Sequence, residues 1–152
     1  MYIVSNATNE YYVNKGKEAE IYIPIDYDLI KHKEEISIAK FLSREFNIYI
    51  ELLIEINENK IKTPDFRFND NYWEIKNVLS ANSIDKRVKI AIQQIVKNIG
   101  GIVLVIDRSN IDIATIKEIV FHRIDRTKIV KIDIIFIKNE KIIEIDRYEK
   151  IK

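Results

Sequence analysis

The sequence contains no cysteine, and it has three glycines and two prolines in 152 residues. The absence of cysteine excludes disulfide bonds, thiolate metal sites and a cysteine nucleophile, so any bound metal must be held by oxygen or imidazole ligands. The scarcity of glycine and proline leaves no place for a flexible linker. Because 47% of the residues are hydrophobic, a chain of this length can bury one proper core, and we expect one domain.

Long apolar runs and an excess of one charge are also absent. No stretch approaches the roughly 18 apolar residues of a membrane span, and no basic segment followed by an apolar one marks a signal peptide, so we expect a soluble protein. The 25 Lys and Arg residues balance 24 Asp and Glu residues. Bulk charge therefore indicates neither a nucleic acid nor a membrane as partner, and evidence for a partner must be local. Walker-type, dinucleotide-binding and nucleophilic-serine motifs are missing, which disfavours nucleotide and acyl hydrolases.

Hydrophobic periodicity predicts an α/β (α+β) fold in which helices flank a mixed central β-sheet. From residue 31 the predicted order is helix, three strands, helix, strand, helix and two strands. The boundaries follow the sequence: a helix over 31–47, a strand over 48–56, a hairpin around 69–71, a helix N-capped by Ser83 and ended by Gly100 and Gly101, a strand over 102–107, a helix from Asp112, and a hairpin turning at Asn139 and Glu140. Residues 1–30 are poorly periodic and are predicted to form an arm of uncertain structure.

The hairpin segment TPDFRFNDNYWEIKN, residues 63–77, carries ionisable side chains inside predicted strands. Side chains alternate along a strand, so Glu74 and Lys76 share one face. A two-residue loop at 69–70 places Asp65 opposite Glu74, whereas a loop at 70–71 places it opposite Lys76. A three-residue loop would turn Asp65 away. We favour a two-residue loop, because it also stacks Phe66 and Phe68 on the side of Trp73 and Ile75.

Two carboxylates on one face can hold Mg²⁺ or Mn²⁺, with Zn²⁺ as a further option. A lysine beside them can orient or deprotonate the attacking water and offset phosphate charge. Glu35 falls on the inward stripe of the first helix and is a candidate third ligand beside Asp65 and Glu74. The plainer interpretation is a pair of cross-strand ion pairs, Asp65 with Lys76 or Arg67 with Glu74, worth a few tenths of a kcal/mol.

The following helix supplies further candidates. Lys86, Arg87 and Lys89 lie off its apolar stripe and suit contacts with a nucleic-acid backbone. Gln94 lies near the sheet face, where its amide can bond a phosphate, a base edge or a catalytic lysine. Elsewhere, Arg108 and His122 offer ingredients of a metal-free RNA cleavage that uses Lys76. His32 stands among charged residues before the first helix and is expected to be exposed.

Pro64-Asp65, an eight-residue gap and Glu74-Ile75-Lys76, set in this order of helices and strands, resemble the PD-(D/E)xK nuclease superfamily of restriction-endonuclease-like fold. The resemblance implies a metal-dependent endonuclease in which Asp65, Glu74, Lys76 and Gln94 are catalytic.

Residues 34–107 also resemble the C-terminal nuclease domains of contact-dependent growth-inhibition (CdiA-type) and related polymorphic toxins. The resembling segments are EISIAKFLSREFN, KTPDFRFNDNYWEIKN, SIDKRVKIAIQQI and GGIVLVID. This resemblance implies a nuclease domain over 31–152, an RNA substrate such as tRNA and a cognate immunity protein. It also implies action in the bacterial cytoplasm after delivery as part of a larger toxin. The sequence departs from such domains after the Glu-x-Lys strand, where NVLSANS replaces a Ser/Pro/Gly continuation.

Three alternatives stay open. The same toxin groups include a metal-free ribonuclease fold of the barnase, colicin and RelE type, for which Lys76, Arg108 and His122 would act without a metal. A DNase with the same carboxylate site is a second alternative. The third is a non-enzymatic immunity or adaptor protein that uses the charged hairpin as an interface.

Overall fold

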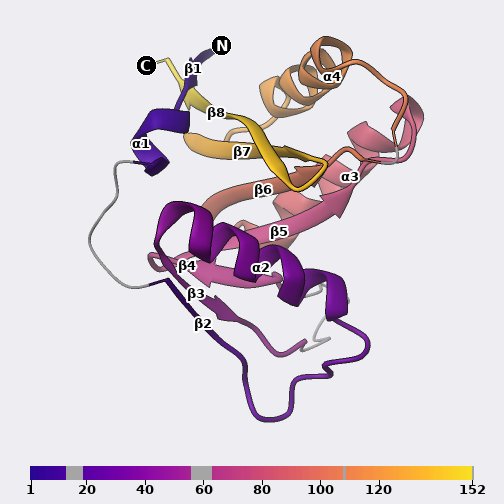
Figure 1. The fold of residues 1–152 in the computed structure, drawn as a ribbon. Helices are drawn as coiled ribbons and strands as arrows, with labels where there is room; N and C mark the ends of the chain where they lie inside the picture. The colour runs from indigo at the N-terminus through magenta and orange to yellow at the C-terminus, as the bar shows by residue number, and fades with distance from the viewer. Residues whose placement is uncertain (13–18, 56–62, 108, 152) are drawn as a thin grey trace.

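The computed structural model describes residues 1–12, 19–55, 63–107 and 109–151, and Figure 1 shows their arrangement. The described residues form one mixed sheet of eight strands, in the order β1-β8-β7-β6-β5-β4-β3-β2. The strands are β1 (Tyr2–Asn6), β2 (Glu20–Tyr22), β3 (Tyr49–Leu52), β4 (Phe66–Phe68), β5 (Asn71–Asn77), β6 (Ile99–Val105), β7 (Lys131–Lys138) and β8 (Lys141–Lys150). The helices are α1 (Thr8–Tyr12), α2 (Lys33–Phe46), α3 (Ala81–Ile95) and α4 (Ile113–Asp125).

From α2 onward the elements follow the order that the sequence predicts, and the helix-flanked mixed sheet is confirmed. The predicted Arg108 and the end of the strand predicted over 48–56 lie outside the described residues. The N-terminal segment, predicted to be an arm of uncertain structure, adds a strand at each edge of the sheet: β1 pairs antiparallel with β8, and β2 pairs parallel with β3. Among the described residues, no helix combines the length and the apolarity needed to cross a membrane.

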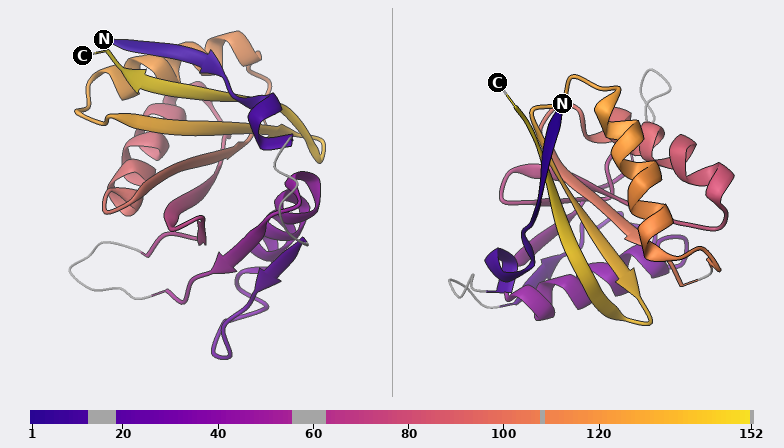
Figure 2. Two further views of the ribbon diagram at one scale, coloured as in Figure 1. Left: turned by 90° about the vertical axis from the view of Figure 1, so that its left-hand side faces the viewer. Right: turned by 90° about the horizontal axis from the view of Figure 1, so that it is seen from above.

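The centre of the sheet is parallel, because β6 pairs parallel with both β5 and β7. α3 and α4 form the crossovers and pack on one face, where they share a core with Ile102 and Leu104. α1 and α2 lie beside the other face, where the core includes Val103 and Val105. Figure 2 shows these two layers of helices on opposite sides of the sheet. The strand β6 is therefore covered on both faces, which explains its continuous apolar run.

The β4–β5 hairpin closes with a two-residue loop. Asn69 and Asp70 have φ angles of 53° and 65°, the left-handed values that a type I′ turn requires. Phe66 pairs with Trp73 in register, and their rings stack with centroids 6.0 Å apart and an interplanar angle of 8°. This register confirms the loop at 69–70 and the placement of Asp65 beside Glu74.

The prediction for Gly100 and Gly101 is wrong. They were expected to end the helix, but α3 ends at Ile95 and both glycines lie in β6. Their small size is required by Trp73, which crosses both: a Cβ at Gly100 would lie 2.3 Å from Trp73 Nε1, and one at Gly101 would lie 2.6 Å from Trp73 Cζ3.

The start of α3 also differs from the prediction. The N-cap is Ser80 rather than Ser83, because the helix begins at Ala81. Ser83 is the third residue of the helix, where its Oγ accepts a hydrogen bond from the Ser80 backbone N–H at 3.3 Å. This bond is one half of a capping box. Ser83 therefore takes part in the cap, but the N-cap position lies three residues earlier, at Ser80. By contrast, Asp112 caps α4 as predicted and accepts from the Thr115 N–H at 2.8 Å.

Candidate active site

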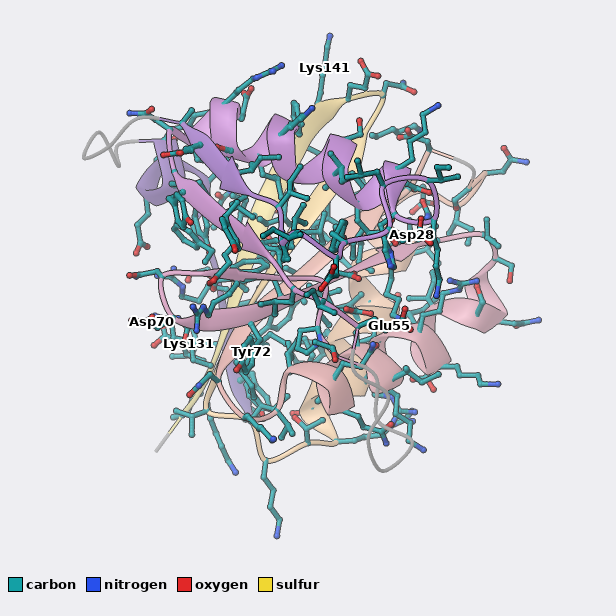
Figure 3. The ribbon with its side chains drawn as sticks, turned by 90° about the horizontal axis from the view of Figure 1, so that it is seen from below. Asp28, Glu55, Asp70, Tyr72, Lys131 and Lys141 are labelled. Carbon is teal, nitrogen blue, oxygen red and sulfur yellow. The ribbon has the colours of Figure 1, made fainter. Side chains whose placement is uncertain are left out.

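A pocket of about 290 Å³ lies beside the carboxyl-terminal half of β5, between the start of α2 and the inner face of α3. Ligands of open α/β sheets commonly bind beside the carboxyl ends of parallel strands, and β5 is parallel to β6. Figure 3 shows this side of the molecule from below, with Glu55 of the pocket toward the middle of the view and Asp70 of the hairpin turn far to its left. The charged residues that line the pocket are Lys31, His32, Glu35, Glu55, Asp65, Glu74, Lys76 and Arg87.

Asp65 and Glu74 are anchored to each other across the hairpin. The Asp65 backbone N–H donates to Glu74 Oε1 at 3.0 Å, and the Ile75 backbone N–H donates to Asp65 Oδ2 at 2.7 Å. Glu74 is 4% exposed, although it is a carboxylate in the middle of a strand. The hairpin backbone therefore holds both carboxyl groups in one place, as the two-residue loop predicted.

Burial raises the pKa of both groups. Loss of solvent raises the pKa of Asp65 well above its ordinary value, and the negative charge of Glu74 raises it further. The pKa of Glu74 is also raised by burial, although its contacts with Asp65 and Lys76 oppose the shift. Two neighbouring carboxylates that resist ionisation together form a site that a cation would stabilise.

Lys76 completes the group on the same face of β5. Its Nζ lies 3.2 Å from Glu74 Oε2, and its side chain is 19% exposed, so the ammonium group borders the pocket. The ion pair between Arg67 and Glu74 that the plainer interpretation predicted is not formed. Glu74 pairs with Lys76 on its own strand, and Arg67 pairs with Glu51 of β3.

α3 adds an amide and a guanidinium. Gln94 is 8% exposed and lines the pocket, and its Oε1 is buried with no hydrogen-bond partner among the described residues. An unpaired buried oxygen is costly, so it is a candidate acceptor for a bound group. Arg87 lies two helical turns earlier on the same inner face and also lines the pocket. Lys86 and Lys89 are exposed and do not line it.

The start of α2 forms a further wall of the pocket. Glu35 lines this wall, as its place on the inward stripe predicted. The prediction that His32 is exposed is wrong, because its side chain is 16% exposed and its ring lies 4.9 Å from that of Tyr27. Sequence periodicity missed His32, Tyr27 and Glu55, since they lie outside the helical stripe and the hairpin. The one available signal was the histidine at the helix start, where Ser, Thr, Asp or Asn is usual.

The donor set suits a hard divalent cation only in part. Among the described residues, no group of three or more His, Asp or Glu side chains is arranged to hold a metal ion, so Glu35 is in the pocket without forming such a group with Asp65 and Glu74. Two carboxylates with waters completing the shell are nevertheless a usual arrangement for Mg²⁺. Asp65 and Glu74 fit that arrangement.

His122 is not brought to this pocket. It lies on α4, its side chain is 60% exposed, and its Nε2 lies 3.8 Å from Glu118 Oε1 one turn earlier. The described lining of the pocket that contains Lys76 does not include it. Lys76 and His122 of the metal-free alternative are therefore not gathered as the carboxylates are.

Comparison with known proteins gives one structural likeness. No protein-family model and no curated protein matches the sequence. A chain of a solved structure described as "CdiA-CT/CdiI toxin and immunity complex from Burkholderia pseudomallei" is similar, with a TM-score of 0.53 and 16% sequence identity, over 82% of this chain and 97% of that chain. The two chains share a fold.

Proposed function

We propose that this protein is a toxin-like endonuclease that hydrolyses phosphodiester bonds in RNA, with tRNA as its substrate. The observation that carries the proposal is the meeting of Asp65, Glu74 and Lys76 in one pocket, with Gln94 beside them. These are the residue types that metal-assisted phosphodiester hydrolysis needs: oxygen ligands, a cation and a polar positioning group.

Each residue has a distinct role in this proposal. Asp65 and Glu74 hold a divalent cation, Mg²⁺ or Mn²⁺, which when bound supplies positive charge to the phosphate and makes a water more acidic. Lys76 orients the attacking water and offsets the charge that develops on the phosphate. The backbone donors from Asp65 and Ile75 keep both carboxylates oriented before substrate binds, so little reorganisation is needed during reaction.

The choice of a nucleic-acid substrate is supported by the cations around the pocket. Arg87 lines it without an ion-pair partner among the described residues, so its guanidinium is free to bind a phosphate. Lys86 and Lys89 are exposed on the same helix and would contact neighbouring phosphates. Such contacts carry affinity but little sequence information, so the preference for RNA rests on the resemblance to the toxin domains.

A cognate immunity protein is the proposed partner, and an immunity role for the chain itself is the second candidate. Both are favoured by the same observation, namely that the similar solved structure is titled as a toxin and immunity complex. We favour the toxin role because an immunity protein has no need to gather two adjacent carboxylates and a lysine around a pocket.

The decisive experiment compares the wild type with Glu74→Gln and with Glu118→Gln, which makes the same change on an exposed part of α4. Each protein is expressed briefly in bacteria, and total RNA is run on a denaturing gel. We expect tRNA fragments from the wild type and Glu118→Gln, and none from Glu74→Gln. With purified protein, EDTA should stop cleavage and added Mg²⁺ or Mn²⁺ should restore it.

Three results would count against the proposal. RNA left intact by the wild type would favour the immunity role, which binding to a toxin chain would then test. Fragmentation of DNA in place of RNA would make the site a DNase. Cleavage that continues in EDTA and in Glu74→Gln would remove the carboxylate mechanism altogether.

A further inference from the structure

The side chain of His32 stands at a helix start without capping it. It is the N-cap residue of α2, yet its side chain makes no capping hydrogen bond. An N-cap residue normally accepts a bond from the first turn, and replacing such a cap by a residue that cannot do so costs about 1 kcal/mol. A position that gives up this stabilisation and turns its side chain into a pocket indicates a functional role.

The preceding turn holds the imidazole in place. Asp28 Oδ1 accepts from the backbone N–H groups of Ile30 and Lys31 at 3.1 and 2.9 Å, and the His32 N–H donates to the Asp28 carbonyl at 3.1 Å. The ring then lies against Tyr27 with an interplanar angle of 37°. This local network orients His32 before any substrate binds.

The charged groups around the ring are acidic on two sides. His32 Nδ1 lies 3.8 Å from Glu35 Oε1, and Nε2 lies 3.8 Å from Glu55 Oε2. Lys31 pairs with Glu55 at 2.9 Å, which leaves Glu35 as the acid of the same helix that faces the imidazole. Histidine is the side chain that readily carries and releases a proton near neutral pH.

The pocket is lined by two separate elements, and each suits a different part of the proposed reaction. Asp65, Glu74 and Lys76 come from the β4–β5 hairpin and its approach, whereas His32 comes from the start of α2. Phosphoryl transfer by in-line displacement needs the nucleophile and the leaving oxygen on opposite sides of phosphorus. A role for both elements in one reaction therefore requires a phosphate bound with its attacked face toward the hairpin and its leaving oxygen toward α2.

We propose that His32 is the general acid that protonates the leaving oxygen of the phosphodiester. This inference rests on the proposed nuclease function. The attacking water, oriented by Lys76, forms a new P–O bond and releases one proton to solvent, while the bond from phosphorus to the leaving oxygen breaks. The electron pair stays on that oxygen, which takes the proton from the imidazolium of His32, and the neutral imidazole later regains a proton from solvent.

The test changes the leaving atom and keeps the rest of the substrate. An RNA is prepared in which sulfur replaces the leaving oxygen at the bond that the wild type cleaves, because a thiolate leaves without being protonated. Wild type, His32→Ala, Glu74→Gln and His122→Ala are compared on the oxygen and sulfur substrates with Mn²⁺ present. His122→Ala makes the matched change at the chain's other histidine, outside the pocket. Circular dichroism melts confirm that each variant is folded.

We expect His32→Ala to slow cleavage of the oxygen substrate by about 100-fold or more, the usual contribution of a general acid. The sulfur substrate should be cleaved within a few-fold of the wild-type rate. Equal losses of cleavage rate on both substrates would make His32 a structural residue, and no loss on either would remove it from the reaction. Each of these results overturns the inference. Glu74→Gln reports separately on the nuclease function. If the wild type cleaves neither substrate, the proposed function fails, and the role of His32 fails with it.

Discussion

Asp65→Asn is expected to abolish cleavage and to stabilise the protein. In the wild type a side-chain oxygen of Asp65 meets the Glu74 carboxylate, and both groups are held close by backbone hydrogen bonds. The asparagine oxygen can still accept from the Ile75 N–H, while its amide N–H donates to Glu74. The substitution therefore replaces a like-charge contact with a charge-assisted hydrogen bond and removes one cation ligand.

The size of the effect follows from that exchange. A hydrogen bond to a charged group contributes about 1.5–3 kcal/mol in proteins. In a chain of this length each kcal/mol moves the melting temperature by about 2–4 °C, so we expect a rise of roughly 3–12 °C. The rise should grow as pH increases, because a protonated Asp65 in the wild type already donates to Glu74 at low pH.

The assay is a thermal melt followed by circular dichroism, with and without Mg²⁺, beside RNA cleavage. Mg²⁺ at about 100 times its Kd should add about 2.7 kcal/mol to the unfolding free energy of the wild type and little to that of Asp65→Asn. Asp70→Asn, in the exposed turn of the same hairpin, is the matched control and should move neither quantity. A lower melting temperature for Asp65→Asn would show that the ionised Asp65 stabilises the fold, and it would refute the reasoning.

Three further predictions test the core and the site. Burial raises the pKa of Asp65 and Glu74, so above their ordinary pKa values of 3.8 and 4.5 the folded state binds more protons than the unfolded state. The unfolding free energy should therefore fall as pH rises through the raised pKa values. Urea titrations at a series of pH values should show a shallower fall for Asp65→Asn. Gly100→Ala places a Cβ 2.3 Å from the Trp73 side chain and should lower the unfolding free energy by about 1–3 kcal/mol. Gly101→Ala places a Cβ 2.1 Å from a backbone oxygen and should lower it by more. Equal urea midpoints for the two variants would contradict the packing. Gln94→Leu removes a buried unpaired oxygen and should raise the melting temperature while it slows cleavage, and a variant with unchanged cleavage would remove Gln94 from the site.

Much of the carboxylate site could be predicted from local sequence. Alternation along β5 determines that Glu74 and Lys76 share a face, and the Asn69-Asp70 pair favours the two-residue turn that carries Asp65 to the same place. The helical period likewise placed Glu35 on the inner side of α2. These features depend on residues only a few positions apart, whose geometry the backbone fixes.

Contacts between distant segments were beyond the sequence. Gly100 follows a helical pattern and reads as a helix terminator, yet it lies in β6, where the Trp73 side chain occupies the space that a Cβ would need. His32 reads as exposed, yet Tyr27, Glu35 and Glu55 lie around its ring.

The sequence by itself determined the order of the elements from α2 onward and the side-chain parity of the hairpin, since both arise from near-neighbour backbone geometry. Only the tertiary structure decided that the N-terminal segment supplies both edges of the sheet, that Gln94 is buried and that a histidine borders the carboxylates. The physical reason is that pairing and packing between segments far apart in the chain depend on the shape and chemistry of both surfaces, and no local pattern contains both.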